Sequence, residues 1–410
     1  MHMAIRALSP DDAVIVSIGR SAIGKARTGQ LTDIRADELA TQVFSKVLDR
    51  VPEISGADLE DLYLGCAEPS GEQGYNLARQ IAILLGYDTL PGTTVNRFCA
   101  SSLQAVRMAA HAIKSGEGQA FLVGGVETAS RYGNISAAKN HRFGNAALRS
   151  EGLMEHGTEW SDPRDRGELP DAYIGMGQTA ENVARMTGTS RQDQDAFAFR
   201  SQRAAAEAAD TGFFDKEIVE VVLENGSRIV RDDSVRRDTT IDRLAELTPV
   251  FSPVGTVTAG NSCPVNDGAS AAVIVSARFA RERGLNPLAR IVSTAVSGLS
   301  PEIMGLGPVE SSRRALLRAG LSITDIDIVE LNEAFSAQVL PSARKIGIDI
   351  ESQLNPFGGS IALGHPFGAT GVRLLATLVN GLQTRDQTLG LATLCVGGGQ
   401  GMAMVIERLS

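Results

Sequence analysis

The chain has 410 residues, of which 43% are hydrophobic, and a formal net charge of -9. This length and apolar content suffice for two core-bearing units, and the negative charge argues against nucleic-acid binding as the main function. The four cysteines lie far apart without a Cys-x-x-Cys pair, and no histidine stands at metal-ligand spacing, so we expect neither a disulfide framework nor a metal site.

The first predicted element is a strand over residues 13–18, and the segment before it lacks the long apolar core of a signal peptide. No stretch of the sequence is long and apolar enough to cross a bilayer. We therefore expect a protein of the reducing cytoplasm without a membrane span.

A candidate nucleophile follows at Cys99, within the segment 96–102. Leu103, Val106 and Ile113 are spaced as on a buried helix that begins at or just after this cysteine. A helix N-terminus favours the thiolate, which is the nucleophilic form. A single buried cysteine is more often a small core residue, so this interpretation depends on what else the chain contains.

The next predicted strand, over 120–123, ends at Gly124-Gly125, and residues 131–257 form a segment rich in Gly, Asp and Arg with a helical run over 191–209. Toward the C-terminus, His365 lies in a loop with Gly364, Pro366 and Gly368, just before a helical run over 372–379. Such a loop can hold an imidazole as a base, although a lone histidine there is more often a turn residue.

A second thiol, Cys395, ends an apolar run over 391–396 that precedes Gly397-Gly398-Gly399. By itself this pattern also fits an ordinary strand that ends in a tight turn.

An internal repeat relates the two ends of the chain. Residues 105–110 parallel residues 371–376, and in that register Cys99 lies opposite His365. Strands alternate with helices in both copies, which predicts α/β layers with a buried helix between sheets. The repeat therefore predicts that Cys99 and His365 face each other across one cleft.

Several of these segments together resemble the thiolase family. The resemblance covers nearly the whole chain and is carried by residues 96–105, 255–261, 266–269, 332–335, 358–371 and 395–401. It implies a five-layered fold of two pseudo-symmetric βαβαβαββ halves with an inserted loop domain. The expected units are 1–130 with the nucleophile, 131–257 as the loop domain over the site, and 258–410 with the histidine and the second cysteine.

The resemblance also implies a function, the reversible thiolytic cleavage of 3-oxoacyl-CoA by an acyltransferase that passes through an acyl-cysteine. Cys99 would be the nucleophile, His365 the base and Cys395 the acid and base of the second step. Asn332, through a water, and His365 would form one oxyanion hole, and the N–H groups of Cys99 and Gly397 the other.

Coenzyme A is the implied co-substrate, with no permanently bound cofactor and no metal. Arg236 is expected beside its adenine end, and Met176 and Met304 as walls near the acyl group. The residues that complete the expected binding set are Cys263, Ala259 and Phe335. The resemblance further implies a homodimer or homotetramer, for which the edge strand near residues 93–95 is a plausible seam.

Three positions depart from the biosynthetic acetoacetyl-CoA pattern of the family. Ser102 stands where many members have glycine, and Cys263 replaces a serine that contacts pantetheine and is a weaker hydrogen-bond partner. Gly175 stands where acetoacetyl-CoA-specific members carry a histidine, which opens space. We therefore expect a degradative enzyme of fatty acid or related β-oxidation.

The alternatives are a biosynthetic acetoacetyl-CoA thiolase and a non-catalytic acyl-CoA or lipid-binding protein with the same fold. A ketoacyl synthase would have histidine where Cys395 stands. A dinucleotide-binding oxidoreductase does not fit, because no βα unit with an acidic ribose ligand follows Gly397-Gly398-Gly399.

Overall fold

The computed structural model describes residues 7–132 and 139–410. The strands are β1 (Ala13–Arg20), β2 (Gly24–Lys25), β3 (Asp61–Gly65), β4 (Gly92–Val95), β5 (Ala120–Thr128), β6 (Val221–Val222), β7 (Arg228–Ile229), β8 (Asn266–Ser276), β9 (Ala289–Gly298), β10 (Ile328–Leu331), β11 (Leu389–Val396) and β12 (Gln400–Arg408). The α-helices are α1 (Ala36–Leu48), α2 (Leu77–Leu84), α3 (Ser101–Ser115), α4 (Gly144–His156), α5 (Met176–Thr187), α6 (Arg191–Asp210), α7 (Ile241–Ala245), α8 (Ala277–Arg283), α9 (Gly307–Ala319), α10 (Ser336–Ile346), α11 (Ser360–Leu363) and α12 (Thr370–Thr384).

Ten of the described strands belong to one mixed sheet in the order β10-β11-β12-β9-β1-β8-β5-β3-β4, with β2 paired to β8. The pairs β10–β11, β3–β4 and β3–β5 are parallel, and the others along this path are antiparallel. Among the described strands, those of the two halves pair with each other only at β1 and β9, through Val14–Arg290 and Ile15–Ala289. The sheet therefore divides at this point into two half-sheets.

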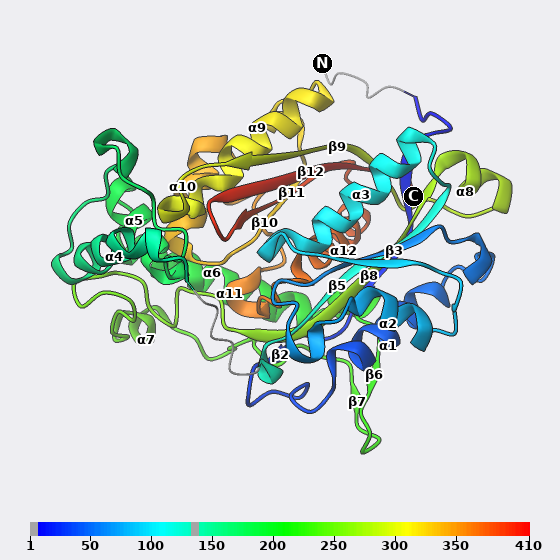
Figure 1. Ribbon diagram of the computed structural model, residues 1–410, viewed down its shortest axis with the longest axis horizontal. Helices are drawn as coiled ribbons and strands as arrows, with labels where there is room; N and C mark the ends of the chain where they lie inside the picture. Colours follow the sequence, from blue (N-terminus) through cyan, green and yellow to red (C-terminus); the bar gives the residue numbers. More distant parts are fainter. Residues whose placement is uncertain (1–6, 133–138) are drawn as a thin grey trace.

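The half-sheets and the helices form five layers, as Figure 1 shows: α9 and α10, the strands β9 to β12, the helices α3 and α12, the strands β3, β5 and β8, and the helices α1 and α2. Separate clusters of buried side chains fill the spaces on the two outer faces and around the central pair of helices. The predicted α/β architecture of two halves around buried helices is confirmed.

The central helices α3 and α12 cross very closely. A Cβ atom on Gly371 would lie 2.3 Å from the backbone nitrogen of Leu103. At the same crossing the Ser102 N–H donates to the Gly368 carbonyl and the Val372 N–H donates to Ser102 Oγ, both at 3.1 Å. The first turn of α3 is thus fixed to the loop that precedes α12, which brings the two copies of the repeat together.

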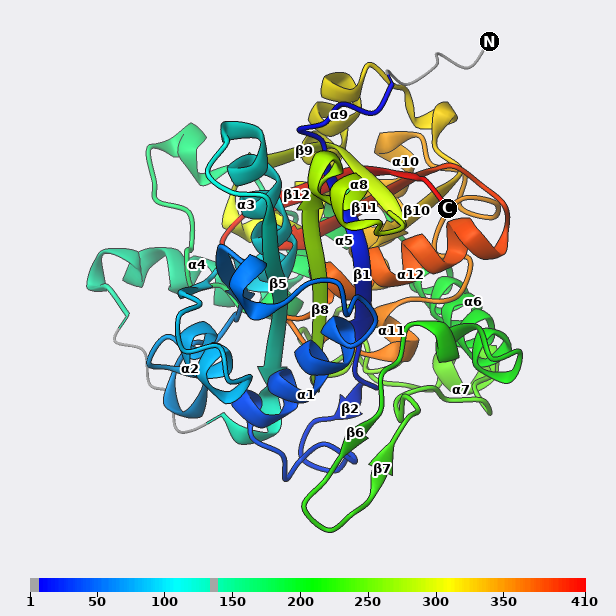
Figure 2. The same ribbon diagram turned by 90° about the vertical axis from the view of Figure 1, so that its right-hand side faces the viewer.

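The segment between β5 and β8 carries α4 to α7 and the hairpin of β6 and β7, which projects away from the sheet in Figure 2. The strand that follows this insertion, β8, pairs with β1 and β5 and so lies in the sheet of the first half. The predicted unit 258–410 would assign β8 to the other half. We therefore propose that the first half is completed by β8. Part of the predicted unit 131–257, residues 133–138, lies outside the described residues.

The prediction that a strand ends at Gly124-Gly125 is wrong, because β5 continues through both glycines to Thr128. A Cβ on Gly124 would lie 2.2 Å from the Ser270 carbonyl oxygen, and one on Gly125 would lie 2.1 Å from the Gly368 carbonyl oxygen. The glycines therefore permit close packing within a strand. Within residues 7–132 and 139–410, no helix has the length and apolar character that a membrane crossing requires.

Candidate active site

Cys99 lies in a short 3-10 turn, η3 (Phe98–Ala100), directly before α3, so the helix begins just after this cysteine as predicted. Phe98 has a left-handed φ of 43°. Its N–H donates to Asn96 Oδ1 and its carbonyl accepts the Ser101 hydroxyl, each at 2.7 Å. These bonds hold a conformation that a non-glycine residue rarely adopts.

Two backbone N–H groups, those of Cys99 itself and of Gly397, act on the Cys99 sulfur and favour the thiolate. Burial has the larger and opposite effect, and raises the pKa of the Cys99 thiol from 9.0 to about 11. Burial therefore favours the neutral thiol of Cys99, whereas its place before a helix predicted a thiolate. Attack on a substrate then requires a base.

His365 follows α11 in the loop that leads to α12, and its backbone N–H donates to Asn266 Oδ1 at 2.9 Å. Its Nδ1 lies 2.7 Å from Thr370 Oγ1, and the Thr370 hydroxyl donates to the Pro366 carbonyl at 2.8 Å. Because a hydroxyl has one hydrogen, Nδ1 must be the donor to Thr370. The proton therefore sits on Nδ1, and Nε2 is left as the basic nitrogen.

Burial, followed by the positive charge of Arg373, lowers the pKa of His365 from 6.5 to about 3. The imidazole is thus neutral at physiological pH, and its Nε2 carries no proton. Its Nε2 is 3.3 Å from the side-chain nitrogen of Asn332, which donates to it.

Asn332 directly follows β10, and its backbone N–H donates to the Thr393 carbonyl on β11 at 3.0 Å. Its side-chain oxygen accepts the Ser360 hydroxyl at 2.6 Å, so its NH2 group faces His365. The same end of β11 carries Cys395 and leads to Gly397. The structure therefore brings the predicted Asn332 and His365 to the end of the strand that carries the second thiol.

Cys395 is fully buried, and burial raises the pKa of its thiol well above 9.0, with further contributions from negative charge at Cys99 and Cys263. Burial likewise raises the pKa of Cys263, again with a contribution from Cys99. The three sulfurs therefore share one site, and Cys263 is held there by the bond from its N–H to the Ala334 carbonyl at 2.9 Å.

The other predicted binding residues are distributed around this site. Met304 and Phe335 belong to the same cluster of buried side chains as Cys395. Met176 begins α5 and is 37% exposed. Ala259 is exposed between buried neighbours, and Arg236 lies on an exposed segment, where its backbone N–H donates to Gln202 Oε1.

Phe251 is an aromatic residue that the sequence analysis missed. A Cβ on Gly177 would lie 2.2 Å from Cγ of the Phe251 ring, so the ring packs directly against this glycine. The same ring meets Phe335 edge to face, with ring centroids 6.1 Å apart. It therefore forms a wall beside a predicted binding residue. The signal that could have found it is its position just before the motif at residues 255–261.

Glu127 is a second missed residue. Its buried carboxylate accepts the N–H groups of Ala67 and Gly368, each at 2.8 Å, and also the Tyr132 hydroxyl at 2.9 Å. It thus connects the end of β3 to the loop that carries His365. No local pattern marks it, because its partners lie far away in the sequence.

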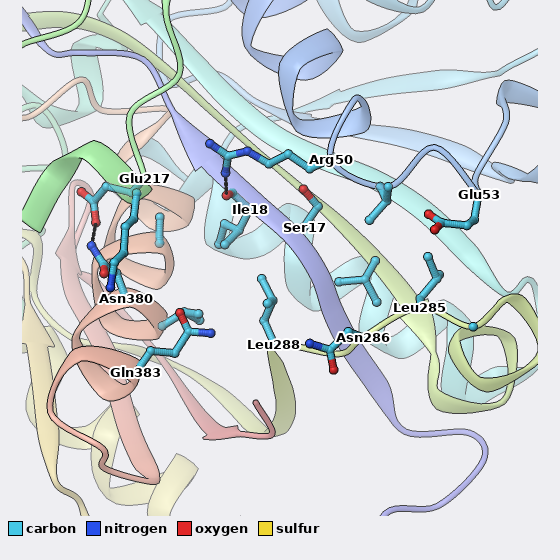
Figure 3. A pocket seen from close by; sticks show the side chains of 16 residues that line it. Ser17, Ile18, Arg50, Glu53, Glu217, Leu285, Asn286, Leu288, Asn380 and Gln383 are labelled. Atoms are coloured by element: carbon cyan, nitrogen blue, oxygen red, sulfur yellow. Dashed lines mark hydrogen bonds between the residues drawn. The ribbon is translucent and has the colours of Figure 1, made fainter.

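A cavity of about 630 Å³ opens elsewhere, between β1, the C-terminal half of α12 and the loop before β9 (Figure 3). In it Arg50 donates to the Ile18 carbonyl at 2.7 Å and Asn380 donates to Glu217 at 3.4 Å. None of the predicted site residues lines it. The chemistry of the three thiols and His365 is therefore separate from this cavity.

Comparison with known proteins gives concordant matches over nearly the whole chain. The family model "Thiolase, N-terminal domain" matches residues 13–278 and "Thiolase, C-terminal domain" matches residues 285–408. A 3-ketoacyl-CoA thiolase of Marinomonas sp. (strain MWYL1) is 43% identical over 98% of this chain and 100% of its own length. A beta-ketoadipyl-CoA thiolase of Pseudomonas knackmussii is 42% identical over 97% of this chain and 98% of its own. The crystal structure of the Bacillus anthracis acetyl-CoA acetyltransferase has a TM-score of 0.85 and 36% identity, and covers 97% of this chain and 99% of its own.

Proposed function

The chain belongs to the thiolase family of acyltransferases, and we propose from this premise that it cleaves 3-oxoacyl-CoA with free CoA, giving acetyl-CoA and a shortened acyl-CoA. The observation that carries the proposal is the convergence of Cys99, the Gly397 N–H and the Cys395 thiol from opposite halves of the chain. Together with a neutral His365, these groups supply a nucleophile, a base, an acid and an oxyanion donor.

In the first half-reaction the Cys99 sulfur attacks the 3-oxo carbon while its proton passes to His365 Nε2. The N–H groups of Cys99 and Gly397 hold the oxyanion that forms on the former carbonyl oxygen. The bond between C2 and C3 then breaks and leaves an acyl group on Cys99 and the enolate of acetyl-CoA. The protonated Nε2 of His365 and Asn332, through a water, bind the enolate oxygen, and Cys395 gives its proton to C2.

In the second half-reaction the Cys395 thiolate takes the proton of the CoA thiol. The CoA thiolate attacks the acyl carbonyl, the Cys99 sulfur leaves, and it recovers its proton from His365. The buried site begins and ends with every group neutral, because burial disfavours the charged forms of Cys99, His365 and Cys395. Each charge that appears in between has a partner within the site.

For the substrate we propose 3-oxoacyl chains longer or bulkier than acetoacetyl, in a degradative pathway. Gly175 supports this, because it has no side chain, and the nearest atom that a Cβ there would meet is the end of the flexible Gln178 side chain, at 3.2 Å. Two relatives carry names that refer to 3-ketoacyl-CoA and beta-ketoadipyl-CoA. The CoA contacts we propose are Arg236, Cys263, Met176, Met304, Ala259 and Phe335, with Phe251 added.

We propose a homo-oligomer assembled through the edge strand β4, which ends the sheet. Large apolar side chains are exposed near this edge, with Tyr75 at 97%, Ile83 at 50%, Leu84 at 54% and Phe98 at 45%. Analytical ultracentrifugation should give a dimer or tetramer, and a monomer would contradict this part. We also place the protein in the cytoplasm, since its four cysteines are free thiols.

The test is the CoA-dependent loss of 3-oxoacyl thioester absorbance across a chain-length series, with wild type and Cys99→Ala measured together. We expect cleavage by the wild type, strongest beyond four carbons, and none by the variant. Strict preference for acetoacetyl-CoA would contradict the degradative assignment. Absence of cleavage with every substrate would contradict the activity.

A further inference from the structure

A buried ion pair lies behind the proposed active site. Arg373 on α12 and Glu330 on β10 are each 1% exposed, and their charged groups are 3.6 Å apart. Neither carboxylate oxygen of Glu330 has a hydrogen-bond partner, and of the three guanidinium nitrogens of Arg373 only Nη2 has one. A buried pair with so few hydrogen bonds contributes little to stability by itself, so its contacts deserve a functional explanation.

The one hydrogen bond that the Arg373 side chain makes to a described residue runs toward the proposed active site. Its Nη2 donates to Ser360 Oγ at 2.6 Å, and Ser360 Oγ lies 2.6 Å from Asn332 Oδ1. A guanidinium can only donate, so Ser360 must accept from it and has its single hydrogen free for Asn332. The Asn332 atom beside Ser360 is therefore the oxygen, and its NH2 group must face His365 Nε2, at 3.3 Å. Because Arg373 can only donate, it fixes the direction of every hydrogen bond in the series from Arg373 through Ser360 and Asn332 to His365.

We propose that Ser360 and Arg373 are positioning residues, which hold the Asn332 amide as a hydrogen-bond donor to the water that binds the enolate oxygen. The inference rests on the proposed function. Once Cys99 has given its proton to His365, Nε2 becomes a donor as well. An unrestrained Asn332 amide would then turn and accept from Nε2, and both donors to the enolate would be lost. The Ser360 hydroxyl prevents this turn, because it donates a hydrogen bond to the Asn332 oxygen and so holds that oxygen away from His365.

The proposal separates two reactions of the same site. Carbon–carbon cleavage produces an enolate and needs the Asn332 donor. Exchange of labelled CoA into acetyl-CoA passes only through acyl-Cys99, whose oxyanion is held by the N–H groups of Cys99 and Gly397. Loss of an oxyanion donor costs about 100-fold or more in rate, and partial loss through disorder costs less. Ser360→Ala should therefore slow cleavage at least about tenfold and leave exchange within about twofold of wild type.

The matched control is Ser342→Ala on α10, which also removes a fully buried hydroxyl with one hydrogen bond, to the Gly305 carbonyl at 2.9 Å. It should leave the ratio of cleavage to exchange unchanged. Melting curves of both variants check folding. If Ser360→Ala does not yield folded protein, Ser360→Cys takes its place, and its weak thiol donor should give a smaller change in the same ratio.

Selective loss of cleavage in the Ser360 variant, absent from the Ser342 variant, would support the proposal. Equal loss of both reactions, or an unchanged ratio, would overturn it. Failure of the proposed function is recognised separately, because the wild type would then cleave no 3-oxoacyl-CoA.

Discussion

The crossing of α3 and α12 leads to a quantitative prediction for Gly371→Ala. The added Cβ would lie 2.3 Å from the Leu103 backbone nitrogen and 2.6 Å from its Cβ, well inside ordinary van der Waals contact. The obstacle includes backbone, which cannot turn aside as a flexible side chain can. Overpacking of this kind costs about 1–3 kcal/mol, and we expect the upper end of that range.

Gly371 is the second residue of α12, so the preference for alanine over glycine that holds in helix interiors offsets little of this cost. The net destabilisation should be about 2–3 kcal/mol. The functional effect should be larger, since the crossing fixes the first turn of α3, after Cys99, to the loop of His365. A displacement of about 1 Å between catalytic groups can cost about 100-fold in rate.

Gly152→Ala on α4 is the control, because a Cβ there meets nothing within 4 Å. It should be neutral or stabilising by up to about 1 kcal/mol, with unchanged kcat. Denaturant unfolding and the 3-oxoacyl-CoA cleavage assay measure both quantities for each variant. A Gly371→Ala protein with the stability and kcat of wild type would refute the reasoning that this crossing sets the catalytic geometry.

Four further predictions concern His365 and the groups that hold its loop. Because the pKa of His365 is lowered to about 3, the pH profile of kcat/KM should have no acid limb near 6.5, and such a limb would contradict the buried neutral imidazole. The same shift lowers stability as pH falls from 6.5 toward 3, since the unfolded chain binds a proton that the folded one does not; denaturant unfolding at pH 7 and pH 5 should show this decline. Thr370→Val removes the acceptor of the Nδ1 proton and should lower kcat about tenfold at a temperature where the variant is still folded, whereas an unchanged kcat would contradict its role in orienting the ring. Glu127→Gln places an NH2 group among the N–H donors of Ala67 and Gly368 and should destabilise the fold by about 3 kcal/mol in denaturant unfolding; wild-type stability would show that these bonds are dispensable.

The positions of Cys99 and His365 in the fold were predictable because local patterns encode them. Helical spacing identified α3 and α12, and the repeat aligned the two residues that precede them. The roles assigned to Asn332 and Gly397 came from the resemblance and remain proposals.

Features that depend on distant partners were not predictable in the same way. The strand β5 continues through its glycines because neighbouring backbones approach them closely, and no local rule predicts this. The neutral state of Cys99 follows from burial by the whole fold, which outweighs the nearby N–H groups. Likewise Ser360 and Arg373 acquire their significance only when α12 packs beside Asn332.

The most direct test of the central claim is to mix the wild-type protein with a 3-oxoacyl-CoA in the absence of free CoA and to measure the intact mass and the modified peptide. We predict an acyl group on Cys99, released as the shortened acyl-CoA when CoA is added. Turnover without this adduct, or with an acyl group on another residue, would contradict the account.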